Sequence, residues 1–271
     1  MKAVLSLALI TFKEGIRNRS LFGIALVALF LFGLNISVAG FFMRDIGKVT
    51  VDMNLSALTI AGLLLVFFVG INLMAKDIDR KTIHLVLSKP LSRAQYIWGK
   101  YLGIQFFVTV SLLLLAGCSS LTVLLLKSMY PAYFGGFSWL IFFVAVAFVL
   151  VKFWVLGAVV IFFSSLTTSS LITLIFSLGA YLAGVTIEEV VFYLKTEMAA
   201  QEQLISESLK NFIEAITWIL PNFAAFDFSL EAAHGLALDS GRLLGVLSYG
   251  VLYSVILLLL ASLIFSRREF N

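Results

Sequence analysis

The stretch KDIDRKTIHLVLSKPLSRAQYIWGK, from Lys76 to Lys100, interrupts a chain that is otherwise strongly apolar. It carries six of the 19 Lys and Arg residues, and long apolar runs flank it on both sides. The chain of 271 residues is 61% hydrophobic and 13% charged, with a mean hydropathy of +1.07. Water-soluble domains average about 25% charged residues. The composition therefore indicates a membrane protein.

Six apolar runs are long enough to cross a bilayer as helices, which takes about 20 residues each. They are residues 21–43, 55–75, 101–126, 137–163, 169–187 and 243–265. Strands of a membrane barrel would be about 10 residues long and would alternate in polarity. These runs are longer and uniformly apolar, so the sequence predicts an all-α, polytopic membrane protein with six transmembrane helices.

The distribution of Lys and Arg predicts the orientation, because short cytoplasmic loops are enriched in these residues. With the N-terminus inside, residues 1–20, 76–100, 164–168 and 266–271 carry 12 Lys or Arg and 4 Asp or Glu. The other loops, residues 44–54, 127–136 and 188–242, carry 6 Lys or Arg and 11 Asp or Glu. We expect both termini and the stretch 76–100 to be cytoplasmic.

The stretch 76–100 has a pattern beyond its charge. Residues 77–88 can form a short helix with an apolar patch, and Pro90 cannot continue that helix. Ser92 followed by Gln95 is typical of a capping box, which starts a new helix at about Arg93. A helix from there to Leu126 is about 50 Å long and exceeds the roughly 30 Å hydrocarbon core. The sequence predicts a short helix, a turn and a helical stalk that projects below the membrane.

This pattern resembles the cytoplasmic coupling loop of type-2 ATP-binding-cassette (ABC) permeases. The matching residues are Asp77, Thr82, Leu85 to Leu87, Ser88-Lys89-Pro90, Ser92-Arg93 and Gly99-Lys100. Two residues depart from the family pattern, since Lys81 stands where glycine is usual and Asp77 where glutamate is commoner. The resemblance implies a dock for an ATPase, formed by Asp77, Thr82, Ile83, Leu85, Val86, Lys89, Pro90 and Arg93.

Three further stretches resemble the same family, and in particular its multi-copper-enzyme-maturation type. TFKEGIRNRSLF (Thr11 to Phe22) resembles the basic segment before the first span. LPNFAAFDF (Leu220 to Phe228) resembles the proline-asparagine segment before the last span, and FSRREF (Phe265 to Phe270) the basic C-terminal stop. The resemblance covers nearly the whole chain, so residues 1–271 are interpreted as a single permease domain.

The resemblance implies a transport subunit in the plasma (cell inner) membrane, in an exporter with two six-span subunits and an ATPase bound to each. The chain lacks the G-x-x-x-x-G-K-[ST] motif that cradles phosphates, so we expect no enzymatic activity and no cofactor in this chain. ATP and Mg²⁺ are expected in the partner ATPase. The other expected partners are a second permease copy, as a homodimer, and membrane lipid; no nucleic acid is expected.

Two segments outside the spans have an amphipathic pattern. In residues 1–20, Leu5, Leu9, Phe12 and Ile16 recur at helical spacing, which predicts an interfacial helix on the inner leaflet that contacts either lipid or the ATPase. In the extracytoplasmic segment 188–242, apolar residues recur every three to four positions from Leu204 to Ile219. This predicts a helix that either caps the exit of a pathway or lies on the outer leaflet.

Lys152 is the one charged residue inside the predicted spans. A lysine at that depth costs roughly 2.5–3.5 kcal/mol on insertion scales, and the spans contain no acidic residue to pair with it. Three interpretations remain: Lys152 faces a hydrated pathway, it is neutral and hydrogen-bonded, or its span is tilted. For the pathway interpretation, Asn35 and Asn72 in other spans are companion residues.

Small residues in the fifth span predict close packing, either in a dimer or against a neighbouring span. They are Ser177, Gly179, Ala180, Ala183 and Gly184. His234 and the scattered Met43, Met53, Met129 and Met198 invite a copper interpretation, but no ligand cluster supports it and we expect no metal site.

Export driven by a separate ATPase is the leading hypothesis. The alternative is a mechanical or regulatory membrane component of the same architecture, which acts on an extracytoplasmic partner without moving a solute. An intramembrane enzyme is disfavoured, because the spans contain no histidine and no charge other than Lys152.

Overall fold

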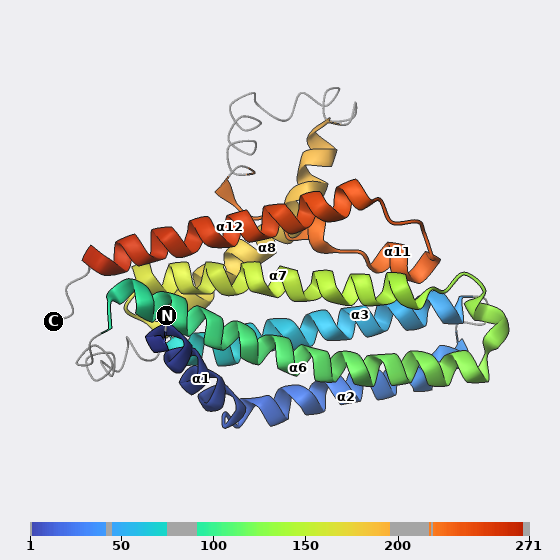
Figure 1. The fold of residues 1–271 in the computed structure, drawn as a ribbon. Coiled ribbons are helices and arrows are strands. Elements are labelled where there is room, and N and C mark those ends of the chain that lie inside the picture. Colours follow the sequence, from blue (N-terminus) through green and yellow to red (C-terminus); the bar gives the residue numbers. More distant parts are fainter. Residues whose placement is uncertain (1, 42–44, 75–90, 196–216, 218, 268–271) are drawn as a thin grey trace.

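The computed structural model describes residues 2–41, 45–74, 91–195, 217 and 219–267. Within these ranges the chain contains helices and no strand, and six helices are long and apolar enough to cross a membrane. They form one elongated bundle (Figure 1). The predicted fold class and the six spans are confirmed.

The long helices begin and end close to the predicted runs. They are α2 (Ser20–Val38), α3 (Ile46–Leu64), α6 (Arg93–Met129), α7 (Trp139–Leu166), α8 (Ser170–Lys195) and α12 (Ser240–Arg267). Shorter elements are α1 (Lys2–Ile16), η1 (Ala39–Phe41), the π-helical η2 (Leu65–Gly70), η3 (Pro131–Phe134), η4 (Ala224–Phe226) and α11 (Ser229–His234). The helical stretch that starts with α3 continues through η2 to Met74.

Two helices extend beyond the spans expected from the sequence. The second span begins at Ile46 rather than at residue 55, and α8 continues to Lys195 rather than ending at residue 187. The expected boundaries followed the charged residues Asp52, Glu188 and Glu189. Charge ends an apolar run, but it does not end a helix, since neither region contains proline and acidic residues are compatible with helical backbone.

The predicted start of α6 is confirmed. The Ser92 hydroxyl accepts a hydrogen bond from the Gln95 backbone N–H at 3.2 Å, and the Gln95 side-chain oxygen accepts one from the Ser92 N–H at 3.0 Å. This capping box opens a continuous helix of 37 residues, which is about 55 Å long. The helix is longer than a hydrocarbon core, as the stalk prediction requires.

Helix α7 lies at the centre of the bundle and contacts α3, α6, α8 and α12 (Figure 1). Many of its apolar side chains are buried, and those of Phe142, Phe153 and Leu156 are completely shielded from solvent. The faces of α2 and α12 are much less covered within this chain, and both expose large apolar side chains. Such faces need lipid or protein to cover them.

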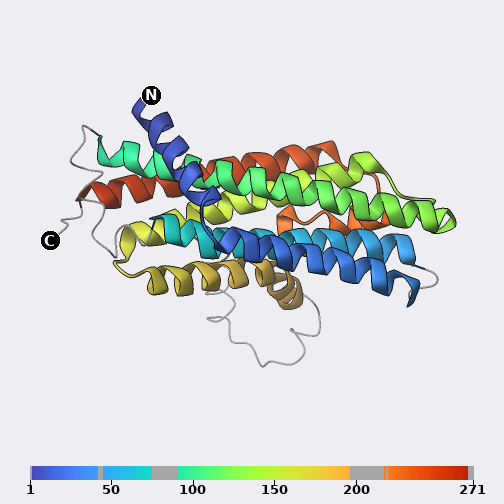
Figure 2. The same cartoon turned by 90° about the horizontal axis from the view of Figure 1, so that it is seen from below.

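Helix α1 crosses α6 at a steep angle (Figure 2). Leu7, Ala8 and Thr11 are buried, whereas Leu5 and Leu9 of the predicted apolar stripe are exposed. The predicted helix is therefore confirmed; Leu5, Leu9 and Ile16 of the stripe are exposed, whereas Phe12 packs against the Phe106 ring of α6. Whether that stripe contacts lipid or the ATPase stays a prediction.

Candidate functional site

Lys152 lies in the middle of the bundle, on α7, with 5% of its surface exposed. It lines a cavity of about 10 Å³, which we call the buried cavity. A space of this size is about enough for one water molecule. The other lining residues are Leu55, Thr59, Ala145, Val149, Phe226, Asp227, Phe228 and Ser229.

The surroundings of Lys152 contain an aromatic ring and a carboxylate. Its Nζ atom is 5.6 Å from the centre of the Tyr181 ring on α8, which is within the range of a cation–π interaction. Asp227 lines the same buried cavity and interacts electrostatically with Lys152. Among the described residues, no acceptor is within hydrogen-bonding distance of Lys152. The structure therefore places a carboxylate beside the lysine without a direct ion pair.

The segment 220–228 brings Asp227 to this position. Its three phenylalanines, Phe223, Phe226 and Phe228, are each at most 2% exposed. The Phe223 backbone N–H donates to the Gly184 carbonyl oxygen at 2.8 Å, which fixes the segment to α8. On the other side, the Tyr249 hydroxyl of α12 accepts a hydrogen bond from the Asn222 N–H at 2.9 Å. This packing holds an exposed aspartate next to a buried lysine.

A second and larger cavity opens at the end of the bundle where α3 begins and α11 lies, opposite to the start of α6 (Figure 1). This distal cavity has a volume of about 670 Å³. It is lined by Asp45, Lys48, Val49, Asp52, Asp227, Ser229, Leu230, Ala233 and His234. Asp227 and Ser229 line both cavities, so the distal cavity and the buried cavity meet at these two residues.

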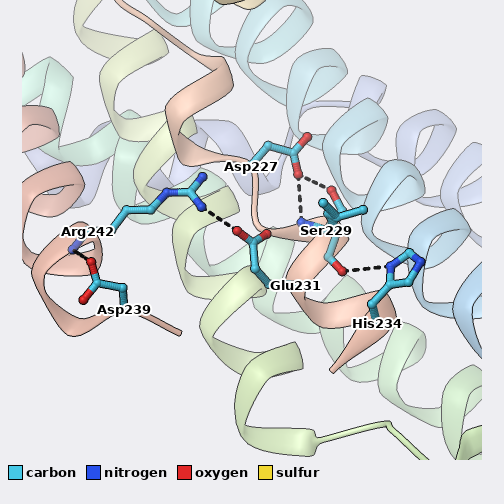
Figure 3. A network of polar contacts seen from close by, with 7 residues as sticks. Asp227, Ser229, Glu231, His234, Asp239 and Arg242 are labelled. Carbon is cyan, nitrogen blue, oxygen red and sulfur yellow. Dashed lines mark hydrogen bonds and ion pairs between the residues drawn. The ribbon is translucent and has the colours of Figure 1, made fainter. Parts of the chain in front are cut away.

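Figure 3 shows the polar contacts around Asp227, α11 and the start of α12. Asp227 Oδ1 accepts hydrogen bonds from the Ser229 backbone N–H, at 2.9 Å, and from the Ser229 hydroxyl. The Arg242 guanidinium forms an ion pair with Glu231 at 2.6 Å, and its Cζ atom is 4.8 Å from the centre of the Phe228 ring. The Ser229 hydrogen bonds fix the direction of Asp227, and the Arg242 contacts join the start of α12 to α11 and to Phe228.

The described part of the chain contains no group of three or more His, Cys, Asp or Glu side chains arranged to hold a metal ion. His234 Nδ1 lies 3.1 Å from the Leu230 carbonyl oxygen on its own short helix. Met43 and Met198 lie outside the described residues. The structure gives the copper interpretation no support.

At the opposite end of the bundle, Lys100 joins three helical segments. Its side chain is buried, and its Nζ atom donates to the Leu73 carbonyl oxygen at 2.7 Å. The same atom is 3.8 Å from a carboxylate oxygen of Glu14 on α1. Leu73 lies at the end of the second span, directly before the predicted ATPase dock. Lys100 therefore ties both helical ends of the docking loop to α1.

Arg93 is the one predicted docking residue within the described part of the chain. Its Nη1 atom donates to the carbonyl oxygens of Phe265, at 3.2 Å, and Ser266, at 3.0 Å. A guanidinium at a helix C-terminus compensates unsatisfied carbonyl groups and the helix dipole. Arg93 thus fastens the stalk to the end of α12. Asp77, Thr82, Ile83, Leu85, Val86, Lys89 and Pro90 lie outside the described residues.

Arg93→Ala should loosen the last turn of α12 and lower the free energy of unfolding by about 1 kcal/mol, because two charge-assisted hydrogen bonds are lost at a partly exposed site. Hydrogen exchange of the α12 amides would measure the loosening, with Arg93→Lys as the control that retains a cation. If hydrogen exchange is unchanged but the ATPase no longer binds, Arg93 contributes to docking and not to the packing of α12.

The two asparagines considered as companions of Lys152 have separate surroundings. Asn35 is 1% exposed, and its Nδ2 donates to the Thr50 carbonyl oxygen of α3 at 3.0 Å. Asn72 donates to the Phe68 carbonyl oxygen within its own helical stretch. Neither lines the buried cavity. Their role in a pathway stays a prediction.

Gln105 and Asp227 are polar residues that the sequence analysis missed. Gln105, on α6, is buried and donates to the carbonyl oxygens of Phe153, at 3.3 Å, and Trp154, at 3.1 Å, on α7. Its position inside an apolar run was a signal that could have found it. The signal for Asp227 was weaker. It is a single charged residue between Phe226 and Phe228, in a segment that is not predicted to span the membrane.

The architecture defines a polytopic helical membrane protein with a buried lysine at its centre and a stalk at one end. The family model described as ABC-2 family transporter protein matches residues 5–270. The chain therefore belongs to the ABC-2 transporter family, as the sequence resemblance implied. A search of curated proteins finds no match.

Proposed function

We propose that this chain is the membrane-spanning permease subunit of an ABC exporter, driven by a separate ATPase. The observation that carries the proposal is the family match over residues 5–270. The geometry supports it, because the stalk α6 starts at Arg93, inside the predicted docking stretch 76–100. Through Lys100 and Arg93, the stalk is bonded to the end of the second span and to the end of α12. A motion of the loop would therefore reach three spans at once.

The proposed orientation places the chain termini and the docking loop in the cytoplasm, in the plasma membrane of the cell. In Figure 1, α1 and the last turn of α12 lie toward the end of the bundle where α6 begins. The loops predicted for this end carry 12 Lys or Arg and 4 Asp or Glu, which favours the cytoplasmic side. The distal cavity would then open to the outside.

A second copy of the chain would complete the proposed transporter. The large apolar side chains exposed on α2 include Phe22, Leu26 and Phe30, and α12 exposes Leu244 and Leu252. Either face could pack against a second copy or against lipid. A homodimer is proposed because the family resemblance implies two six-span subunits.

The replacement of both Leu85 and Val86 by Asp should detach the ATPase, because two charges would enter an apolar docking contact without partners. We expect the ATPase to disappear from affinity-purified permease and substrate-stimulated ATP hydrolysis in reconstituted bilayers to fall to background. The spans are unchanged, so the amount of permease in the membrane should stay the same.

Ser88→Asp is the matched control, since it adds a charge to the same segment without removing an apolar side chain. Undiminished co-purification of the ATPase with the double variant would overturn the docking assignment. If ATP hydrolysis responds to an extracytoplasmic protein but no solute crosses the bilayer, the mechanical function replaces export.

A further inference from the structure

The distal cavity contains more negative than positive charge. Among the described residues that line it, Asp45, Asp52 and Asp227 are acidic and Lys48 is the one lysine. Lys48 is already paired with Asp45 at 3.1 Å. His234 is the remaining titratable residue in the lining. Among the described residues that line the cavity, no lysine or arginine is paired with Asp52 or Asp227.

Lys152 does not line the distal cavity, but it lies behind it, on the buried side of Asp227. Its side chain is 95% shielded from solvent and reaches the buried cavity, where Asp227 and Ser229 separate it from the distal cavity. No acceptor among the described residues is within hydrogen-bonding distance of it. Asp227 therefore has a cation on its buried side and an open cavity on its other side. Such a carboxylate can be shared by Lys152 and a second cation that enters from the distal cavity.

The size and the walls of the distal cavity limit the ligand. A volume of about 670 Å³ is in the range of small-molecule sites, which run from about 300 to 1,000 Å³. Val49, Leu230 and Ala233 give the cavity apolar walls beside the carboxylates. No metal-binding group of three side chains is present in the described residues. An organic cation with an apolar body suits these features better than a metal ion.

We propose that the distal cavity binds an organic ammonium ion through Asp52 and Asp227, in competition with Lys152 for Asp227. The bound ion would belong to the class of substrate that the exporter releases, and this part of the proposal rests on the proposed function. The ammonium group lies between the two carboxylates, and the apolar body of the ligand contacts Leu230 and Val49. Lys152 weakens binding, because it repels the ligand cation and holds Asp227.

The test measures binding of phenethylammonium to the purified full-length chain in a nonionic detergent, without an ATPase. Phenylethanol and phenylacetate are the neutral and anionic analogues, which should bind much more weakly. Asp52→Asn should weaken phenethylammonium binding about fivefold and Asp227→Asn about tenfold. Glu189→Gln is the control, since it removes one exposed negative charge that does not line the cavity.

The decisive variant is Lys152→Met, which should tighten phenethylammonium binding about fivefold, because it removes a like charge near the site. Unchanged or weaker binding in this variant would overturn the competition. Tighter binding of phenylacetate than of phenethylammonium, with loss of binding in Lys152→Met, would overturn the cation site in favour of an anion site. If Asp227→Asn fails to fold, Asp52→Asn and Lys152→Met still decide the outcome.

These measurements need no ATPase, so their failure leaves the proposed function untouched. Conversely, a chain that binds the ammonium ion but never co-purifies with an ATPase would retain the site and lose the exporter assignment.

Discussion

Gly184→Leu is expected to lower the free energy of unfolding by about 3 kcal/mol or more and to abolish transport. A Cβ atom on Gly184 would overlap the Pro221 carbonyl oxygen and lie 2.7 Å from the Phe223 ring. The Phe223 N–H is also hydrogen-bonded to the Gly184 carbonyl oxygen, so the two backbones cannot separate without losing this bond. Overpacking usually costs about 1–3 kcal/mol, and a collision with backbone lies at the upper end.

Thermal unfolding in detergent and transport in vesicles would measure these two effects. Gly179→Leu is the matched control on the same helix, since no atom lies within 4 Å of a Cβ placed there. The control should leave the stability of the single chain unchanged. If it nevertheless abolishes transport, its face belongs to the interface with a second copy. Normal stability of Gly184→Leu would show that the segment 220–228 is not packed against α8.

The second large effect is expected at Asp227. Asp227→Asn should destabilise the protein by about 2 kcal/mol, because a buried lysine loses its nearest negative charge. This value is below the 3–5 kcal/mol typical of a fully buried pair, since Asp227 is exposed and solvent screens it. Asparagine keeps an acceptor oxygen for the Ser229 N–H, so the change removes the charge and leaves the local turn intact.

Replacement of the lysine, instead of the aspartate, should have little effect on stability. Lys152→Met leaves Asp227 in contact with solvent and removes the buried cation, so the free energy of unfolding should stay the same or rise. In the double variant, Lys152→Met should recover most of the stability lost in Asp227→Asn. Denaturation of all four proteins gives the coupling energy between the two residues. Additive effects in this cycle would mean that Asp227 does not stabilise the Lys152 charge.

Much of the fold was predictable because it depends on local properties. Six apolar runs specify six spans, since a helix in lipid must bury its backbone polar groups internally and only its side chains contact the lipid. The start of α6 was also predictable, because the capping box involves two residues three positions apart, Ser92 and Gln95. The extra turns before residue 55 and after residue 187 were missed, because hydropathy reports the membrane boundary and not the end of a helix.

The packing of the fifth span could not be predicted in full from the sequence of that span. Its small residues predicted packing in a dimer or against a neighbouring span, and α8 does pack against the neighbouring span α7. At Gly184, however, the close contact is with a different part of the same chain. It is the segment around Pro221 and Phe223, which has no helical periodicity to announce that it packs into the bundle. Gly179, which looks equivalent in sequence, has open space beside it.

Lys152 shows most clearly what the sequence and the tertiary structure each decide. The sequence alone shows that a lysine lies at the depth of a fourth span and that none of the six apolar runs carries a carboxylate. Only the tertiary structure decided its surroundings, because Asp227 is 75 positions away and reaches it through the folded segment 220–228. Hydropathy describes how each segment partitions between water and lipid, but a charge inside a bundle is stabilised by whatever side chains the packing of distant segments brings beside it.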